Sequence, residues 1–392
     1  MESLFWLALG LLAYTNAGYF ILVLLLGPVV RYWRGSGLPA ATGSDTAQNT
    51  PFVSMVISLH NEERHISQRI DNFEALDYPA DKKQFLLGDD CSTDQTRAII
   101  RERAARNPQI KLLPFDTHQG KTAVINQIVP QANGDIIAFT DANTFWQPDS
   151  LRLLVRHYAD PRVGAVGGRL VLRSTTGINT DDAYWRYETL LKQRESELGV
   201  QLGAPGGIYT LRKQLFHPLR SDVIQIDDFI WPVSVYWQGH IGVNEPAAIA
   251  HEEAAPHVEA EFRRKVRIGT GDFRALWECR ALLNPLRGWV SFAFWSHKML
   301  RWSAPLLLLL LLLANLFLLD HLLYRWLFGL QLAFYLLAVV GYFVSRQQHL
   351  FAKICRIPYY FLGSNLALAI GFYKCATGRQ KATWTQKAHR AA

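Results

Sequence analysis

Cysteine is scarce in this sequence of 392 residues. There are four, at Cys91, Cys279, Cys355 and Cys375. Their spacing fits neither a metal-binding motif nor a paired disulfide framework, which argues against a cysteine zinc site and a disulfide-rich secreted domain. The folded part of the protein is therefore expected in a reducing compartment such as the cytosol. The sequence also lacks internal repeats and heptad arrays, so solenoids and coiled coils are excluded.

Charged residues are missing from a long stretch at the N-terminus. No residue from Ser3 to Val30 is charged, and this run exceeds the roughly 20 residues that cross a bilayer. A cleaved signal peptide has a positive start and a shorter apolar core, whereas here Arg31 and Arg34 follow the run. We expect a retained anchor over residues 1–34, with the N-terminus outside and Arg31 inside.

Three further uncharged runs lie toward the C-terminus, at Ser303–Leu319, Trp326–Ser345 and Ile357–Phe372. The first two predict a pair of antiparallel membrane spans over 303–345, joined by a short outside turn. A third crossing would place the basic tail outside, against the usual bias of positive charge toward the cytoplasm. An interfacial or dipping helix within 346–392 is therefore expected instead.

The net charge of +8 is concentrated beside these apolar runs. Lysines and arginines in such places contact anionic lipid headgroups, so membrane lipids explain the charge and nucleic acid is not needed as a partner. The stretch Ser291–Trp302 mixes aromatic residues with Lys298 and Arg301. This mixture predicts interfacial helices over residues 281–302.

Strands and helices alternate in the middle of the chain, over residues 51–280, after a small polar linker at 35–50. Alternation of this kind predicts a parallel sheet with ligands at the carboxyl ends of its strands. Ser92 or Thr93 is expected to cap the helix that follows the second strand. Polar clusters occur where three of the strands end, at His60–Glu63, Asp89–Asp90 and Asp141–Asn143.

The stretch FTDANT (139–144) places a carboxylate directly after a buried strand, where an unpaired charge is costly. Each polar cluster alone is more often a cap or a turn. Three at one sheet edge suit a nucleotide with Mg²⁺ or Mn²⁺, because these cations prefer oxygen ligands and leave room for phosphate oxygens.

Six segments in order carry a resemblance: SLHNEE, LLGDDCSTDQT, GKTAVIN, FTDAN, GAPGGIYTLRKQLF and QIDDFIWP. This series resembles the family 2 inverting glycosyltransferases, whose membrane-integrated branch includes the hyaluronan, chitin, cellulose and poly-N-acetylglucosamine synthases. The match runs from about Pro51 to His251 and continues weakly through SHKMLRW and TGRQKATW. The resemblance implies an α/β nucleotide-sugar-binding domain of the GT-A fold with a mostly parallel sheet, flanked by membrane and interfacial helices.

The resemblance also implies a divalent metal at the family's DxD motif, which is Asp141-Ala-Asn143 here. Asn143 stands in place of the usual second acid, and an amide oxygen ligates a hard cation more weakly. His251 is a candidate third ligand, although a lone histidine is more often structural. The predicted metal ligands are thus Asp141, Asn143 and His251, with Mg²⁺ or Mn²⁺ as the cofactor.

Recognition of the donor base is implied at Asn61, Glu62 and Asp90. Lys121 would lie near the diphosphate, and the alternative is a solvated helix start. Because helix N-termini disfavour cations, a lysine in the first turn supports a phosphate partner. Asp89 is expected to hold its loop, and Asp94 to cap or solvate the next helix.

Inversion at the anomeric carbon needs a general base that takes the proton of the acceptor hydroxyl. The family's base is the second acid of an ED-like pair, which corresponds to Asp228, with Asp227 orienting or binding the acceptor. Glycosidases also use paired carboxylates, but a diphosphate leaves without a general acid, so one base suffices. Gly206 and Gly207 belong to a loop that the family places beside the acceptor; a tight turn is the plainer reading.

One segment departs from the family pattern. Processive synthases carry Q/R-x-x-R-W after the base, whereas this chain has Arg264-Lys-Val-Arg267-Ile. Both arginines are expected to bind the donor diphosphate, with a basic helix at the membrane surface as the alternative. The missing tryptophan makes long-chain polymerisation less expected, unless Trp277 or Trp384 replaces it.

The sequence therefore predicts a membrane-bound, metal-dependent enzyme on the cytoplasmic face of a bacterial-type inner membrane. Its expected donor is a nucleotide sugar, UDP-linked, and its expected acceptor is a growing extracellular or capsular polysaccharide. The chemical alternative is transfer of one sugar to a lipid or lipid-linked acceptor. From another class, the chain could be a non-catalytic glycan-binding subunit of the membrane, although its retained acids and arginines argue for catalysis.

Overall fold

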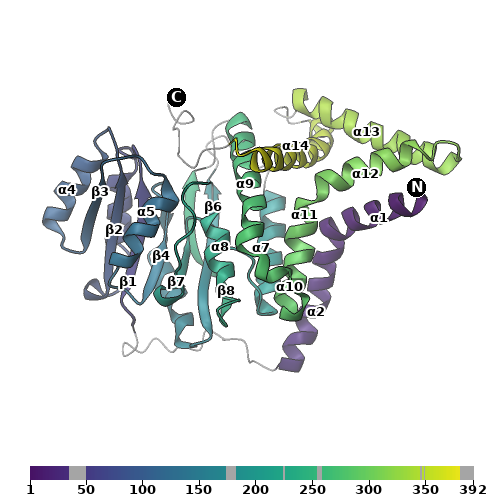
Figure 1. Cartoon of the computed structure of the whole chain (residues 1–392). Helices are drawn as coiled ribbons and strands as arrows, with labels where there is room; N and C mark the ends of the chain where they lie inside the picture. The colour runs from purple at the N-terminus through teal and green to yellow at the C-terminus, as the bar shows by residue number, and fades with distance from the viewer. Residues whose placement is uncertain are drawn as a thin grey trace. The chain divides into compact units, whose positions relative to one another are not determined.

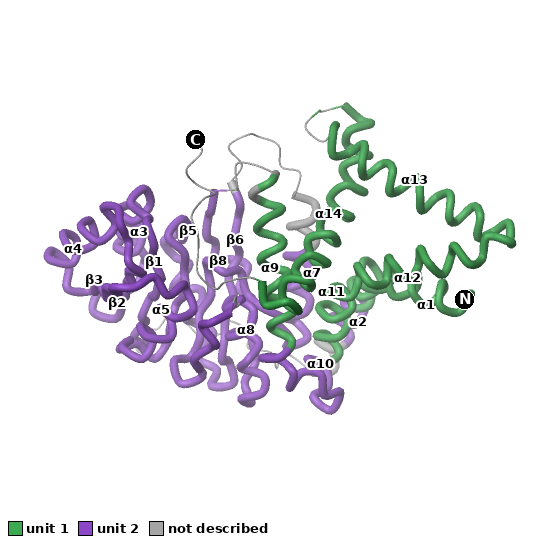
Figure 2. The backbone as a smooth tube through the Cα atoms, turned by 45° about the horizontal axis from the view of Figure 1, so that its top comes forward, with its two compact units in different colours: residues 1–22, 257–276, 292–380 green, residues 23–256, 277–291, 381–392 purple. Residues whose placement is uncertain are grey.

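The computed structural model of the chain (Figure 1) describes residues 1–34, 50–173, 182–223, 226–253, 258–344, 347 and 349–379. The described residues form two compact units (Figure 2). The helical unit lies within 1–22, 257–276 and 292–380, and the sheet unit lies within 23–256 and 277–291. The expected linker at 35–50 falls almost wholly outside the described residues, and Trp384 also lies outside them.

The sheet unit contains a sheet of eight strands in the order β3-β2-β1-β4-β7-β6-β8-β5. The strands are β1 (Val53–Leu59), β2 (Lys83–Asp90), β3 (Ile110–Phe115), β4 (Ile136–Phe139), β5 (Thr144–Trp146), β6 (Val163–Arg173), β7 (Tyr209–Arg212) and β8 (Ile241–Glu253).

The strand directions confirm the prediction of a mostly parallel sheet. β1 pairs in parallel with β2 and β4, β2 with β3, and β6 with β8. β7 is antiparallel to both β4 and β6, so β4 and β6 run the same way, and β5 is antiparallel to β8. Six strands consequently end at one edge of the sheet, which we call the carboxyl edge.

Helices follow the strands as the alternating pattern predicts. They are α3 (Ile66–Glu74), α4 (Thr96–Arg106), α5 (Lys121–Ile128), α6 (Ser150–Val155), α7 (Asp182–Glu197) and α8 (Asp227–Ser234). In α3 the buried residues Ile66, Ile70 and Phe73 recur at helical spacing. They join the core formed by β1, β2 and β4, whose side chains are almost all buried.

The expected cap of α4 is wrong. Ser92 and Thr93 instead bond to Asn61 in the loop after β1. The N-cap position is occupied by Gln95, whose side chain makes no capping bond, and Oδ1 of the preceding Asp94 accepts the N–H of Thr96 at 3.0 Å. The hydroxyls of Ser92 and Thr93 thus join the loops after β1 and β2 at the carboxyl edge. Local sequence does not reveal this contact, because Asn61 is distant in the chain.

The helical unit contains helices of different length and composition. They are α1 (Glu2–Ala13), the start of α2 (Tyr19–Arg34), most of α9 (Val258–Glu278), the end of α10 (Trp289–Ala293), α11 (Leu300–Trp302), α12 (Ala304–Leu316), α13 (Leu322–Val344) and α14 (Leu350–Thr377). Phe5, Ala8 and Leu12 of α1 pack in one apolar cluster with Leu307 and Leu311 of α12. Outside this cluster, many large apolar side chains of the unit are exposed.

Among the described residues, two helical stretches are long and apolar enough to cross a membrane, Glu2–Val29 and Leu322–Val344. The expected span at 303–319 is shorter in the structure, because α12 ends at Leu316. Its 13 residues reach about 20 Å, less than the roughly 30 Å of a bilayer core. It qualifies only together with Trp289–Trp302, from which it bends by 60°. α14 is not among these candidates, so the predicted interfacial position of 357–372 stays a prediction.

Candidate active site

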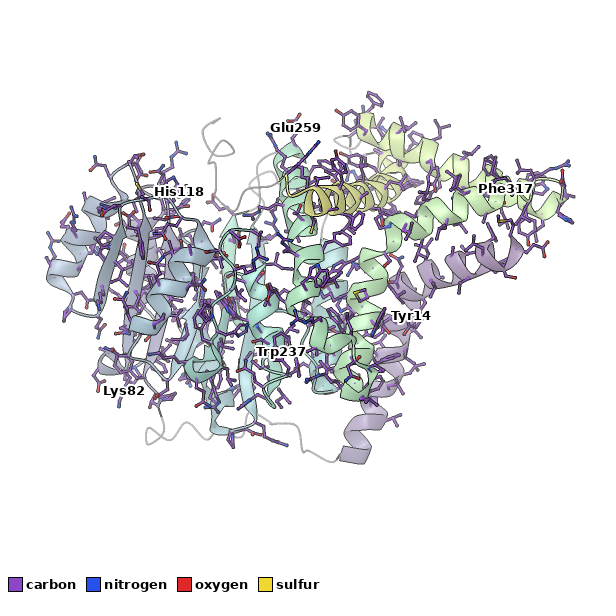
Figure 3. All side chains as sticks on the ribbon, viewed as in Figure 1. Tyr14, Lys82, His118, Trp237, Glu259 and Phe317 are labelled. Atoms are coloured by element: carbon purple, nitrogen blue, oxygen red, sulfur yellow. The ribbon has the colours of Figure 1, made fainter. Side chains whose placement is uncertain are left out.

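The three predicted polar clusters lie together at the carboxyl edge. Leu59, which ends β1, pairs with Asp89 near the end of β2, and Val56 of β1 pairs with Phe139, the last residue of β4. The loops that follow these strands therefore leave the sheet side by side. His118, labelled in Figure 3, lies in the loop that follows β3 at the same edge.

Lys121 supplies the positive charge that compensates Asp141. Its Nζ lies 3.0 Å from Oδ1 of Asp141 and 3.3 Å from Oδ2 of Asp227. Lys121 is the first residue of α5, where the helix dipole disfavours a cation, so these carboxylates must hold it there. They, with Asp228, raise the pKa of Lys121 above its usual value although burial opposes this.

Asp227 and Asp228 begin α8 next to this ion pair. Burial raises the pKa of Asp228 to about 6, and the neighbouring Asp227 adds to the rise while Lys121 opposes it. Asp228 is half-buried, and its carboxylate faces Gly206, where an added Cβ would lie 2.9 Å from Oδ2. An acid that titrates near neutral pH is suited to exchange a proton during a reaction.

Glycines bring the loop before β7 against this carboxylate. The N–H of Ala204 donates to the carbonyl of Asp228 at 2.8 Å. A Cβ on Gly207 would lie 2.5 Å from Oγ1 of Thr144, and the carbonyl of Gly207 accepts the indole N–H of Trp146 at 2.8 Å. Side chains at these two glycines would therefore displace their neighbours.

Asn61 and Glu62 follow β1. Asn61 adopts a positive φ of 57°, and its Oδ1 accepts the N–H of Thr93 at 2.8 Å, so it ties the loops after β1 and β2 together. Burial raises the pKa of Glu62 to about 7, with contributions from the charges of Asp141 and Asp94. Both residues lie at the carboxyl edge, where a donor base is expected.

Asp90 is buried and turned toward the loop before α5. Its two oxygens accept the N–H groups of Gln119 and Gly120, each at 2.7 Å, and its Oδ2 lies 2.8 Å from Nδ1 of His118. Gly120 needs a φ of 91°, which side chains rarely allow. In the described contacts Asp90 therefore shapes the loop that presents Lys121.

The expected role of Asp89 in holding its own loop agrees with its contacts. Asp89 is fully buried and forms an ion pair with Arg97 of α4. Its Oδ1 also accepts the N–H of Ser92 at 3.3 Å.

Asn143 directly precedes β5, and His251 lies on the neighbouring strand β8. Nδ2 of Asn143 donates to Glu252 at 3.3 Å, and His251 pairs with Phe145 in the register of these strands. Within the part of the chain that the structure describes, no group of three His, Cys, Asp or Glu side chains is close enough to hold a metal by itself. Mg²⁺ in enzymes is commonly held by one or two carboxylates together with substrate phosphates. Asp141 and the amide of Asn143 fit such a cation, one that binds with a diphosphate.

Two residues that the sequence did not single out support this site. Arg69 is fully buried in α3, and its charge stabilises that of Asp141, while burial lowers its own pKa to about 9. Arg69 donates to Asn72, whose amide in turn accepts the N–H of Trp146 at 2.9 Å and donates to its carbonyl at 2.8 Å. The sequence does contain a signal for Arg69, because this arginine lies on the apolar stripe of α3 with Ile66, Ile70 and Phe73.

Arg264 and Arg267 lie on α9 in the helical unit. They are three residues apart in a helix, as predicted, and Arg264 lies 3.7 Å from Glu261 on the same helix. Their binding to a donor diphosphate remains a prediction.

Family models match this chain over two overlapping regions. Residues 54–217 match the model described as glycosyl transferase family 2, and residues 136–345 match the model described as glycosyl transferase family group 2. The second match alone covers more than half of the chain.

Curated relatives include enzymes of two kinds. A β-monoglucosyldiacylglycerol synthase of Synechocystis is 29% identical over 171 residues, which are 41% of this chain and 36% of that protein. A poly-β-1,6-N-acetyl-D-glucosamine synthase of Staphylococcus aureus is 25% identical over 197 residues, 48% of this chain and 46% of that one. The matched part spans about a third of the length of the glucosyldiacylglycerol synthases.

Among solved structures, the mannosyltransferase PcManGT from Pyrobaculum calidifontis, in complex with GDP-Man and Mn²⁺, superposes with a TM-score of 0.66. It is 20% identical, and the alignment covers 96% of this chain and all of the other. At that identity the likeness speaks for the fold alone, which is the GT-A fold with its mixed α/β sheet. Because the match over residues 136–345 covers more than half of the chain, the chain belongs to glycosyl transferase family group 2, and the match of residues 54–217 to glycosyl transferase family 2 agrees with it.

Proposed function

We propose that this protein transfers one sugar, with inversion, from a nucleoside diphosphate sugar to a hydroxyl group of a lipid or lipid-linked acceptor at the membrane surface. The observation that carries the proposal is the grouping of Asp141, Asp227 and Asp228 around Lys121 at the carboxyl edge. This is the position at which α/β sheets bind ligands.

Asp228 is the proposed general base. The acceptor oxygen attacks the anomeric carbon as the bond from that carbon to the diphosphate oxygen breaks, and the hydroxyl proton passes to the Asp228 carboxylate. The nucleoside diphosphate leaves on the opposite face of the sugar. Asp227, which accepts a hydrogen bond from the hydroxyl of Tyr209 at 3.4 Å, orients the base and the acceptor.

Lys121 and Asp141 are proposed to bind the donor diphosphate. Lys121 neutralises phosphate oxygens directly. Asp141 and Asn143 would hold a divalent cation, which would supply further positive charge for the departing diphosphate. His251, on β8, is the third proposed metal ligand. The Mn²⁺ in the mannosyltransferase complex supports a divalent cation, and both Mg²⁺ and Mn²⁺ are candidates.

The base of the nucleotide is proposed to lie over Asn61, Glu62 and Asp90. UDP is the expected nucleotide, and GDP, which carries mannose in the mannosyltransferase complex, is the alternative to test. Arg264 and Arg267 are proposed to contact the diphosphate when the donor is bound, because guanidinium groups bind phosphates in a bidentate manner. Gly206 and Gly207 leave room for the acceptor next to Asp228.

A lipid acceptor is favoured by two observations. Arg264-Lys-Val-Arg267-Ile lacks the tryptophan that processive synthases carry. The described helices offer two candidate spans, or up to three, which is few for a polymer conduit within one chain. The similarity to β-monoglucosyldiacylglycerol synthases supports the same acceptor class.

Elongation of an extracellular or capsular polysaccharide is the second candidate. The similarity to poly-β-1,6-N-acetyl-D-glucosamine synthases supports it. For either acceptor we propose that the sheet unit lies in the cytoplasm of a bacterial-type cell, at the inner membrane, where nucleotide sugars are available.

The test is release of the nucleoside diphosphate from a panel of UDP- and GDP-sugars by membranes containing the protein, with Mg²⁺, Mn²⁺ or a chelator. Asp228→Asn is expected to lose at least about a hundredfold in kcat, as for removal of a general base. Asp222→Asn, at an exposed acid of the same unit, is the matched control. Equal rates for wild type and Asp228→Asn would reject the assignment of the base, whereas no release by the wild type from any donor would leave a non-catalytic binding role.

Mass spectrometry of the product separates the two acceptor classes. A lipid carrying a single sugar in excess donor supports our proposal. A ladder of long glycans would reject single transfer and favour the polysaccharide.

A further inference from the structure

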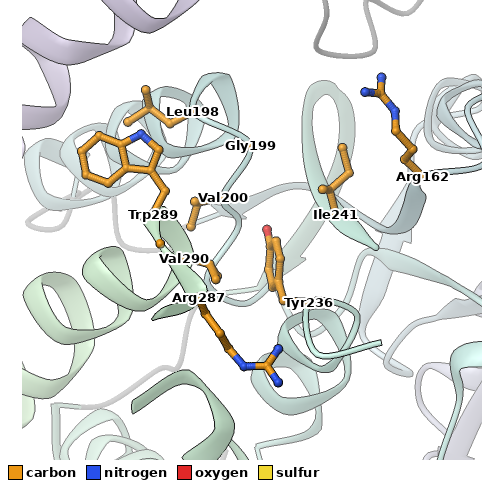
Figure 4. A pocket seen from close by; sticks show the side chains of 10 residues that line it. Arg162, Leu198, Gly199, Val200, Tyr236, Ile241, Arg287, Trp289 and Val290 are labelled. Atoms are coloured by element: carbon orange, nitrogen blue, oxygen red, sulfur yellow. The ribbon is translucent and has the colours of Figure 1, made fainter. Parts of the chain in front are cut away.

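The sheet unit contains a pocket of about 690 Å³ that the proposed reaction does not use (Figure 4). Its walls come from the segment Leu198–Val200, from Tyr236, from the amino ends of two strands and from the turn Arg287–Val290. The volume lies within the range of small-molecule sites, about 300–1,000 Å³.

The pocket lies at the sheet edge opposite to the acidic cluster. Arg162 immediately precedes β6, and Ile241 is the first residue of β8. Both strands run in the same direction as β4, whose carboxyl end carries Asp141. The pocket is therefore separated from the sugar-transfer site by the length of the strands.

The charge of the pocket lining is entirely positive. Arg162 and Arg287 are its only charged residues. Arg162 forms an ion pair with Asp160 at 2.7 Å, whereas no described carboxylate lies within ion-pair distance of the exposed Arg287. The hydroxyl of Tyr236 accepts the N–H groups of Gln201 and Gly242. One guanidinium thus remains for an anion, and the planar fork of arginine matches the geometry of a phosphate group.

A rigid turn presents Arg287. Oδ1 of Asn284 accepts the N–H of Leu286 at 3.0 Å, and the N–H of Gly288 donates to the carbonyl of Pro285 at 3.0 Å. Gly288 adopts φ 65° and ψ −133°, a conformation that residues with side chains rarely reach. The backbone at Arg287 and Trp289, on either side of it, is consequently fixed by the turn before any ligand binds.

Exposed apolar residues of the same stretch of chain favour a lipid over a free anion as the ligand of the pocket. Leu286 is 91% exposed and Trp277 is 69% exposed, and both belong to the short stretch 277–291 of the sheet unit. Exposed leucine and tryptophan next to arginine are typical of segments that lie in a membrane interface. The apolar part of the pocket, with Trp289 and Val290, suits the glycerol and the first methylenes of a lipid.

We infer that this pocket binds the headgroup of an anionic phospholipid, with the phosphate on Arg287 and the glycerol against Trp289. The lipid bound here is neither donor nor acceptor of the sugar. It anchors the sheet unit to the surface of an anionic membrane, and its binding is independent of the proposed function.

Native mass spectrometry of the full chain in a neutral detergent tests the inference. Phosphatidylglycerol, phosphatidylcholine and inorganic phosphate are titrated in separate series. Phosphatidylglycerol is expected to bind in preference to phosphatidylcholine, and Arg287→Gln is expected to weaken its tightest site at least about tenfold, which is about 1.4 kcal/mol. Trp289→Leu is expected to weaken phosphatidylglycerol but not inorganic phosphate.

Arg106→Gln is the matched control, because Arg106 is an exposed arginine of the same unit, far along the chain on α4. Its lipid binding is expected to equal that of the wild type. An unchanged melting temperature of Arg287→Gln without lipid excludes misfolding as the cause. Equal binding of the two lipids, no loss in Arg287→Gln, or binding of inorganic phosphate alone would each overturn the inference.

Discussion

At the scale of single residues, the site carries more negative than positive charge. Lys121 contributes one positive charge, and Asp141, Asp227 and Asp228 contribute up to three negative charges around it. A diphosphate would add further negative charge. A divalent cation, together with the proton that Asp228 retains up to about pH 6, offsets this excess, which is a physical reason to expect metal dependence.

The pKa of Asp228 predicts the acid limb of the reaction. If Asp228 is the base, it must be ionised to accept a proton, so kcat/KM is expected to rise about tenfold per pH unit below pH 6 and to level off above it. The measurement is nucleotide release from pH 5 to pH 9. Glu62, whose pKa is raised to about 7, titrates in the same pH range. The profile is therefore repeated with Glu62→Gln, in which this group is absent. A limb near pH 6 that persists in Asp228→Asn would contradict the assignment.

The raised pKa of Asp228 also makes the stability of the fold depend on pH, and stability is expected to fall over the pH range in which kcat/KM rises. The folded protein holds the proton of Asp228 more tightly than the unfolded chain, where the pKa is near the ordinary 3.8. The contribution of this group to the free energy of unfolding is therefore full below 3.8 and falls as the pH rises to about 6. Asp228→Asn removes this dependence and relieves the repulsion with Asp227, so the variant is expected to be at least as stable as the wild type at pH 8.

Lys121→Met is predicted to disable the site without loss of the fold. The methionine preserves the length of the side chain but leaves three carboxylates that repel one another. Donor binding is expected to weaken and kcat to fall by about 10²–10³, as when one preorganised donor is removed. The acid limb is expected to move above pH 6, because Lys121 lowers the pKa of Asp228. Lys111→Met, at an exposed position on β3, is the control.

An unchanged acid limb in Lys121→Met would show that Lys121 and Asp228 are not coupled. Isothermal titration of the nucleoside diphosphate separates the effect on binding from the effect on kcat.

At the scale of secondary structure, the sequence predicts the strands that form the nucleotide-binding half of the sheet. β1, β2 and β4 are apolar runs that end in polar residues, so both their existence and their common edge follow from local pattern. The pairing of β5 with β8 and the reversal at β7 do not follow, since they depend on long-range register. For the same reason the contact of Asn143 with Glu252 was not predictable.

The direction in which side chains point is the second feature that the sequence does not predict. The sequence places Asp90 at the carboxyl edge, but not its two bonds to the backbone of the loop before α5. The sequence likewise suggested a metal as the partner of Asp141, while the described partner is Lys121, which lies 20 residues earlier on a different element. Both contacts arise only when the loops after β2, β3 and β4 are brought together by the sheet.

Asn72 of α3 is predicted to hold the Asp141–Asn143 loop in place. It bonds to both the N–H and the carbonyl of Trp146, so it joins α3 to β5 directly after that loop. Asn72→Ala leaves these buried groups without partners, at a cost of about 1–3 kcal/mol each. The melting temperature is expected to fall by several degrees, at about 2–4 °C per kcal/mol for a domain of this size.

The matched control for Asn72→Ala is Asn133→Ala, at an exposed position of the same unit. Activity at a temperature well below melting is expected to fall as well, with a higher KM for the metal, because Asp141 and Asn143 lose their fixed position. A lower melting temperature with unchanged metal dependence would limit Asn72 to a structural role.

At the scale of the whole molecule, the two units have different surfaces. The sheet unit buries a large apolar core around the sheet, with exposed apolar side chains such as Trp277 and Leu286 outside it. The helical unit leaves large apolar side chains of α13 more than half exposed, namely Leu322, Trp326, Leu330, Leu336, Val339 and Phe343. Contiguous apolar surface of this kind is uncommon on water-soluble proteins and is typical of contact with lipid.

The surface of α13 predicts that the protein remains in the membrane fraction through high salt and alkaline carbonate and is released only by detergent. Leu336→Arg places a charge on the exposed face near the middle of α13 and is expected to reduce insertion, since arginine at the centre of a span costs about 2.5–3.5 kcal/mol. Leu336→Ala removes the same side chain without adding charge and should insert normally. Fractionation with carbonate measures both variants beside the wild type. Release of the wild type by carbonate, or equal insertion of the two variants, would mean that α13 rests on the membrane surface or against protein and does not cross the bilayer.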